Sequence, residues 1–135
     1  MNDSDIVLIE ERLGLKLPLV VRAFLTHIDS LPPTAITERF VVRSPAEMLD
    51  LNRRLRANGY YHLPWFAEFL AIGADPGDCI FFIDLRDTDY PVRLADHDFD
   101  DVQDFPEIVR SVNSYPEYLL GLISQWQKEG HEPRT

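Results

Sequence analysis

The sequence predicts an α+β domain in which about four helices cover a central, mostly antiparallel sheet. Apolar residues recur at helical spacing near both ends of the chain and once in its middle. Between the middle and last helices, the apolar run Cys79–Ile83 has no polar alternation and is flanked by turn-forming clusters, as is typical of a buried strand. The 135 residues, 45% of them hydrophobic, suffice for a single core. We therefore expect one domain over residues 1–130 and a frayed tail over residues 131–135.

Two helices are expected before residue 30. A polar residue within positions 2–4 can cap the first helix, and its apolar residues recur at helical spacing as far as Leu13. Gly14 is placed to end this helix, because glycine accepts the left-handed backbone that follows many helices. The second helix restarts at Pro18 and carries an apolar stripe down to Ile28, so we expect it to pack on the core.

The middle of the chain predicts a short strand, a third helix and a longer strand. Phe40–Val42 is β-branched and suits an edge strand. Ser44–Glu47 has the spacing of a capping box with proline at the first helical position, and Asn58–Gly59 closes the helix that it opens. Leu70–Ile72 is expected to be a strand that leads into the Cys79–Ile83 segment.

The second half of the chain predicts a strand pair and a last helix. Pro91–Ala95 should pair antiparallel with Cys79–Ile83, because a turn cluster separates them. The only cysteine lies inside the first of these strands, which excludes an internal disulfide and favours a buried role for Cys79. Ser114–Glu117 repeats the capping-box spacing and opens the last helix.

The charge of the chain is concentrated in one segment. Residues 75–107 hold eleven acids against two bases, Arg86 and Arg93, which gives −9 of the total −10. We expect one edge of the sheet to carry almost all of this negative charge. Binding a nucleic-acid backbone needs clustered lysine and arginine, so the composition argues against it and favours a basic protein partner. A focused negative patch speeds encounter with such a partner and orients it.

The chain shows no targeting or membrane signal. Its first residues lack a positive region followed by an apolar one, and nowhere do about eighteen apolar residues run together. We therefore expect a cytoplasmic protein that does not insert in a membrane.

The chain carries a series of short motifs in a fixed order. They are Glu10 or Glu11 with Leu13-Gly14, Leu17-Pro18, Phe24-Leu25, Met48–Asn52, Ile72-Gly73, Gly77-Asp78, Phe82–Asp84, Pro91-Val92, His97-Asp98 and Ser114–Leu119. In this order the motifs resemble those of the SUKH superfamily of the Smi/Knr type. The resemblance covers about Ile6 to Trp126 and departs from the family where His27–Pro33 replaces an Asn-Gly-Gly-like turn. It implies an α+β fold and no enzymatic activity, and we predict no cofactor. It also implies binding and neutralisation of a cognate toxin domain, often a nuclease, in the cytoplasm.

Calcium is one alternative use of the acidic segment. The acids at EF-hand positions 1, 3, 5, 9 and 12 are Asp96, Asp98, Asp100, Asp104 and Glu107. Position 6 is Asp101 where the loop needs glycine, and Phe105–Pro106 interrupts the helix that should follow. A solvated acidic loop explains the same residues, so we predict no metal site.

Catalysis is the other alternative. His97 lies between two aspartates and could act as a general base, but the sequence supplies no nucleophile to it. Cys79 is expected inside the sheet, no serine sits on a glycine-flanked elbow, and no glycine motif forms a nucleotide cradle. We therefore predict no catalytic residues.

These observations lead to a hypothesis of an immunity protein that occludes its toxin stoichiometrically. The predicted partner-binding residues are Asp87, Asp89, Tyr90, Asp96, Asp98, Phe99, Asp100, Asp101 and Asp104, with Tyr90 and Phe99 as exposed aromatic anchors. The alternative is a regulatory protein-interaction domain of the same fold without a toxin partner.

Overall fold

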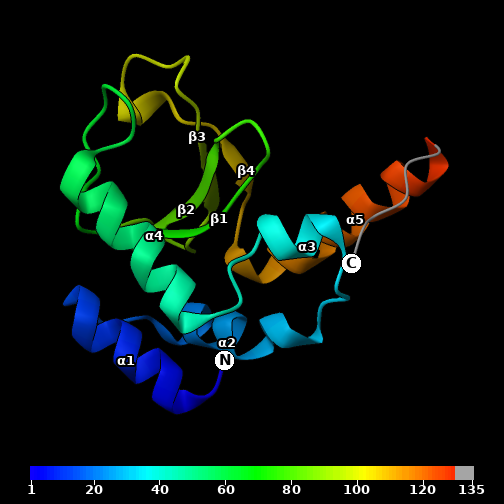
Figure 1. Ribbon diagram of the computed structural model, residues 1–135, viewed down its shortest axis with the longest axis horizontal. Helices are drawn as coiled ribbons and strands as arrows, with labels where there is room; N and C mark the ends of the chain where they lie inside the picture. The colour runs from blue at the N-terminus through cyan, green and yellow to red at the C-terminus, as the bar shows by residue number, and fades with distance from the viewer. Residues whose placement is uncertain (130–135) are drawn as a thin grey trace.

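The computed structural model describes residues 1–129 and confirms the α+β prediction, with five α-helices and one four-stranded antiparallel sheet in that range (Figure 1). The helices are α1 (Asp3–Leu13), α2 (Leu19–His27), α3 (Ala35–Arg39), α4 (Pro45–Asn58) and α5 (Tyr115–Lys128). The strands are β1 (Phe69–Ala74), β2 (Ile80–Asp84), β3 (Val92–Ala95) and β4 (Glu107–Val109). The predicted tail lies outside the described residues, so the domain boundary at residue 130 stays a prediction.

The sheet has the strand order β1-β2-β3-β4, and every neighbouring pair is antiparallel. The predicted pairing of the two central strands is confirmed, with Ile80 opposite Ala95 and Ile83 opposite Val92. The prediction that Cys79 lies inside this strand is wrong. β2 begins at Ile80, and Cys79 is half-buried just before it. The reason is the turn: the Asp75 N–H donates to the Cys79 carbonyl, and the Asp75 carboxylate accepts the Cys79 N–H, both at 3.0 Å.

The two faces of the sheet are covered differently. Leu70, Ile72, Phe81, Ile83 and Val92 point to a core that they share with helices α1, α2, α4 and α5, the helix-covered face. Their neighbours along each strand point the other way, as strand alternation requires. These residues, Phe69, Ala71, Ile80, Phe82 and Ala95, pack under Tyr60, Leu63, Trp65 and Phe105, the loop-covered face. Loops before β1 and after β3, together with Leu55 of α4, therefore close this smaller part of the core.

A buried asparagine joins α4 to β1. The Asn52 side-chain amide donates to the carbonyls of Met48 and Ala71 at 2.8 and 3.0 Å, and its oxygen accepts the Ala71 N–H at 2.8 Å. The ladder shifts register between Ala71 and Gly73, where a bulge leaves backbone groups that need such partners. A Cβ on Gly73 would lie 1.9 Å from the Phe40 carbonyl oxygen, so only glycine fits.

The predicted strand at Phe40–Val42 is wrong. A short helix that the sequence reading missed, α3, ends there with Phe40 as its C-cap. Its start is fixed by Thr34 and Thr37, whose side chains reciprocally accept each other's backbone N–H groups. Val42 still donates a backbone hydrogen bond to Ile72 at 2.7 Å, so the extended segment runs beside β1 without forming a ladder.

The caps predicted from sequence are partly confirmed. Asn2 caps α1 through a full capping box, and Gly14 ends it with φ 65°. The Ser44 hydroxyl accepts the Glu47 N–H at the start of α4. Ser114 precedes α5, but its side chain makes no capping bond because a 3₁₀ turn over Val112–Ser114 leads into the helix.

Candidate partner-binding surface

The structure separates the acidic segment into two groups at opposite ends of the sheet. Because the strands are antiparallel, the β1–β2 turn and the residues after β3 share one end, and the β2–β3 turn lies at the other. The five residues of β2 put roughly 16 Å between the ends. The expectation that one edge carries the whole field is therefore replaced by two regions. The open end holds Asp75, Asp78, Asp96 and Asp98, and the paired end holds Asp84, Arg86, Asp87, Asp89 and Arg93.

Both bases of the acidic segment, Arg86 and Arg93, form ion pairs with aspartates at the paired end. The Arg86 Nε and Nη2 atoms donate to the two Asp84 carboxylate oxygens, each at 3.0 Å, and these bonds raise the pKa of Arg86. The Asp84 side chain is only 14% exposed. Arg93 donates from Nε to the Asp87 carboxylate at 2.9 Å. Two carboxylates are thus neutralised by the protein's own arginines.

The paired end offers less to a partner than the sequence suggested. Asp87 is half-buried in its ion pair with Arg93, while Asp89 is exposed on the β2–β3 turn with φ 65°. Tyr90 is not an exposed anchor: it is half-buried against the helix-covered core, and its carbonyl accepts the Val112 N–H at 2.9 Å. The turn needs Tyr90 for packing, which explains its burial.

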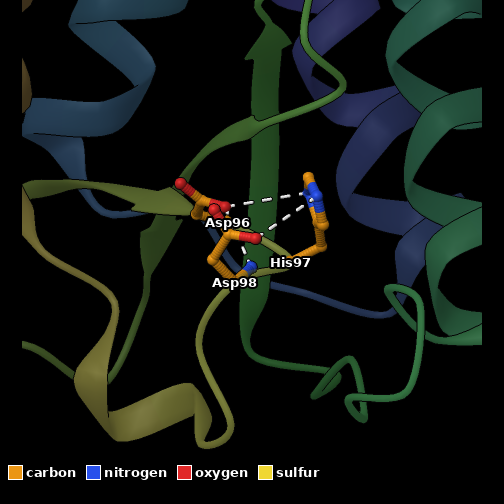
Figure 2. A group of neighbouring side chains, drawn as sticks. All are labelled: Asp96, His97 and Asp98. Atoms are coloured by element: carbon orange, nitrogen blue, oxygen red, sulfur yellow. Dashed lines mark hydrogen bonds and ion pairs between the residues drawn. The ribbon is translucent and has the colours of Figure 1, made fainter.

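At the open end the carboxylates have no arginine or lysine partner among residues 1–129. The Asp96 carboxylate accepts the Asp98 N–H at 3.0 Å, which folds the chain into a turn directly after β3. His97 faces both carboxylates, with Nδ1 3.7 Å from Asp96 and Nε2 3.5 Å from Asp98 (Figure 2). The Asp98 side chain is 82% exposed, so this charge meets solvent.

The loop that follows presents more acids. Asp100, Asp101 and Asp104 are exposed, and the Asp101 carboxylate accepts the Gln103 N–H at 2.9 Å to start a 3₁₀ turn. Phe99, the other predicted anchor, is half-buried, and its ring contacts Phe105 with centroids 6.1 Å apart. The loop therefore points its aromatic residue into the loop-covered core and its carboxylates outward.

Sequence reasoning missed the exposed aromatic residue of the open end, Tyr61. Tyr60 and Leu63 exchange both backbone hydrogen bonds at 2.9 Å, which leaves Tyr61 at the tip of a tight turn with φ 52° and 57% of its surface exposed. Its ring centroid lies 5.0 Å from that of His97, and its hydroxyl donates to Asp78 at 3.4 Å. Its sequence neighbour Tyr60 is only 4% exposed and belongs to the core.

The residues with EF-hand spacing do not form an EF-hand. Val102–Asp104 is a 3₁₀ turn, and Glu107 begins β4 where the motif requires a helix. One oxygen or nitrogen atom from each of Asp96, His97 and Asp98 lies within 4.8 Å of the others. These three consecutive residues are partly or fully exposed, a common arrangement for carboxylates that are simply solvated.

The cysteine nearest this group is poorly suited to nucleophilic chemistry. Burial, with smaller contributions from Asp75 and Asp96, raises the pKa of Cys79 from 9.0 to about 11. Its thiol is therefore protonated at neutral pH, whereas the thiolate is the reactive form. The open end combines exposed carboxylates with one exposed ring, and this combination suits recognition of a cation.

Comparison with known proteins gives one match. The SMI1 / KNR4 family (SUKH-1) matches over residues 1–121. No curated protein and no solved structure matches the chain. None of the helices in residues 1–129 has the length and apolar character needed to cross a membrane.

Proposed function

We propose that this chain, which belongs to the SMI1 / KNR4 family (SUKH-1), is an immunity protein that binds and neutralises a cognate toxin domain in the cytoplasm. Members of the family are generally non-enzymatic immunity or regulatory proteins. The proposed mechanism is stoichiometric occlusion of the toxin through an acidic surface, without catalysis or a cofactor.

The observation that supports a basic partner is the set of carboxylates left without a cation. Arg86 and Arg93 neutralise Asp84 and Asp87, so apart from Asp89 the exposed negative charge of these acids comes from the open end and the loop after it. A nuclease must hold a phosphate backbone and therefore carries positive charge around its active site. An acidic protein that covers such a site competes directly with its substrate.

Growth rescue tests the proposal. The chain is co-expressed with the toxin domain encoded next to it, and growth is compared with that of cells expressing the toxin alone. The immunity role predicts rescue together with a one-to-one complex in size-exclusion chromatography. Failure to rescue growth from any neighbouring toxin domain would reject immunity and favour a regulatory interaction domain of the same fold.

Charge reversal tests the acidic surface separately. Asp98, Asp100 and Asp101 are changed together to lysine, and association with the toxin domain is followed by stopped flow at several salt concentrations. Loss of steering should slow association by about tenfold or more at low salt and flatten its salt dependence.

The matched control changes Glu11, Glu38 and Glu129 to lysine. These acids are exposed and lie outside the acidic segment, so the control alters the total charge equally. A smaller effect in the control would place the steering in the segment, whereas equal slowing in both variants would show that only net charge matters.

A further inference from the structure

A cavity of about 380 Å³ opens between the C-terminal end of α4 and the β1–β2 turn. Its walls are mainly apolar and aromatic, and they include Leu51, Leu55, Tyr60, Tyr61, Asp78 and Ile80. The volume falls within the lower part of the range for small-ligand sites and can hold one long side chain. The cavity adjoins the open end, because Tyr61 contacts His97 as well.

The walls of this cavity are held firmly. The Tyr60 hydroxyl donates to the Asp78 carbonyl at 2.9 Å, and the Tyr60 and Tyr61 rings meet edge to face with centroids 4.9 Å apart. Both Tyr61 and Asp78 have positive φ, 52° and 63°, a backbone conformation that side-chain-bearing residues rarely adopt. A Cβ on Gly59 would lie 2.7 Å from the Leu63 carbonyl oxygen, which leaves the turn little freedom.

The charge around the cavity is negative. Asp78 lies on its rim, and Asp75, Asp96 and Asp98 belong to the same end of the sheet. Arg54 also lines the cavity, but it is already paired with Asp50 at 3.0 Å. An incoming cation would therefore meet an aromatic wall and a carboxylate without a competing arginine pair.

The other end of β2 shows how such a site is filled. There the guanidinium carbon of Arg86 lies 5.4 Å from the Phe66 ring centroid and 5.8 Å from that of Phe69, while both of its donors bind Asp84. At that end, aromatic rings and a carboxylate together bind the protein's own Arg86. Tyr61 and Asp78 repeat this combination at the open end, where no arginine within residues 1–129 pairs with Asp78 and the nearby Arg54 is paired with Asp50.

We infer that this cavity is an anchor pocket for an arginine side chain of the basic partner protein. The inference rests on the proposed function for the identity of the partner. The guanidinium plane stacks on Tyr61, its donors reach the Asp78 carboxylate, and the aliphatic stem lies against Leu55 and Ile80. Arginine fits better than lysine because its planar group stacks and binds a carboxylate through two donors.

The test uses a pentapeptide, Gly-Gly-Arg-Gly-Gly with blocked ends, titrated into isotope-labelled protein and followed by NMR. The same peptide with citrulline, the neutral isostere of arginine, is the ligand control. The pocket predicts saturable shifts centred on Tyr61 and Asp78 with a Kd in the millimolar range, as expected for one side chain. The citrulline peptide should produce no comparable shifts.

Two variants and a matched control locate the binding. Tyr61→Ala removes the aromatic wall, and Asp78→Asn removes the charge while keeping a residue that tolerates positive φ. Each should weaken arginine binding by between about twofold and about thirtyfold. Glu38→Gln makes the same charge change at an exposed residue outside both the acidic segment and the cavity, and it should leave binding unchanged.

Three results would overturn the pocket: no arginine-dependent shifts, equal shifts with citrulline, or equal weakening by Glu38→Gln. Each of them leaves growth rescue by the chain unaffected, because the peptide titration needs no toxin. Failed rescue with normal arginine binding would instead reject the toxin partner and keep the pocket.

Discussion

The two ends of the sheet carry similar chemistry in different states. Each combines carboxylates with aromatic rings next to a cavity, of about 330 Å³ at the paired end and about 380 Å³ at the open end. At the paired end Arg86 and Arg93 satisfy the carboxylates internally. At the open end Asp75, Asp78 and Asp96 accept hydrogen bonds from neutral donors, and no arginine or lysine within residues 1–129 pairs with them or with Asp98. We therefore expect the ion-paired acids to contribute more to stability, and we propose the open-end acids for recognition.

The largest expected effect is on the alkylation rate of Cys79, whose thiol lies at the open end. Its raised pKa, about 11, predicts that iodoacetamide modifies the native thiol at pH 8 at least about tenfold more slowly than the urea-unfolded thiol. Replacing Asp75 and Asp96 by asparagine should lower the pKa of Cys79 and speed the reaction, while Asp87→Asn at the other end should not. Equal rates in native and unfolded protein would contradict this picture.

The raised pKa of Cys79 also makes the free energy of unfolding depend on pH. The folded state holds the Cys79 proton more tightly than the unfolded state, so the contribution of the thiol is complete below pH 9.0. It is lost as the pH rises toward about 11. Cys79→Ala should flatten the fall in urea-unfolding free energy over this window, and an unchanged slope would exclude the thiol as its source.

Arg93→Gln should remove the ion pair between Arg93 and Asp87 at the paired end. It leaves the half-buried Asp87 without its cation, and the free energy of unfolding should fall by about 1–2 kcal/mol. Adding Asp87→Asn to the same chain should recover part of the loss, because no buried charge then remains. Urea denaturation of the single and double variants measures both effects, and an unaltered single variant would show that the pair is only a surface contact.

The smallest effect is expected from neutralising the open end. Asp96→Asn with Asp98→Asn removes repulsion among like charges and should raise stability by less than about 1 kcal/mol at low salt. The gain should fade as salt rises, since exposed charges are screened over about 10 Å at 0.1 M. A loss of stability that persists at high salt would instead assign these carboxylates a structural role.

Local patterns predicted much of the fold. The Cys79–Ile83 run placed β2 to within one residue, and Gly14 ends α1 in the left-handed conformation. The short elements were missed. α3 starts at a threonine pair in place of the usual Ser/Thr and Glu signature. β4 has only three residues, too few for a strand pattern, and is recognisable only through its pairing with β3.

The site depends on contacts that no local pattern contains. The division of the acids between two ends follows from antiparallel pairing, and the pairing of Asp84 and Asp87 depends on where two arginines point. Tyr60 and Tyr61 are adjacent in sequence, yet one is core and the other surface. A turn signal was present in Gly59, because a tight turn after glycine points successive side chains to opposite sides.

Asn52 has a consequence for how any partner would bind. Its three hydrogen bonds tie α4 to β1, and these elements lead directly to the two sides of the anchor pocket. Tilting α4 would strand the buried Ala71 amide, so such motion is suppressed and this amide should exchange its hydrogen only on global unfolding. We therefore expect the proposed pocket to keep one shape before and after contact. Association there should cost little conformational entropy and proceed by rigid docking without a folding step.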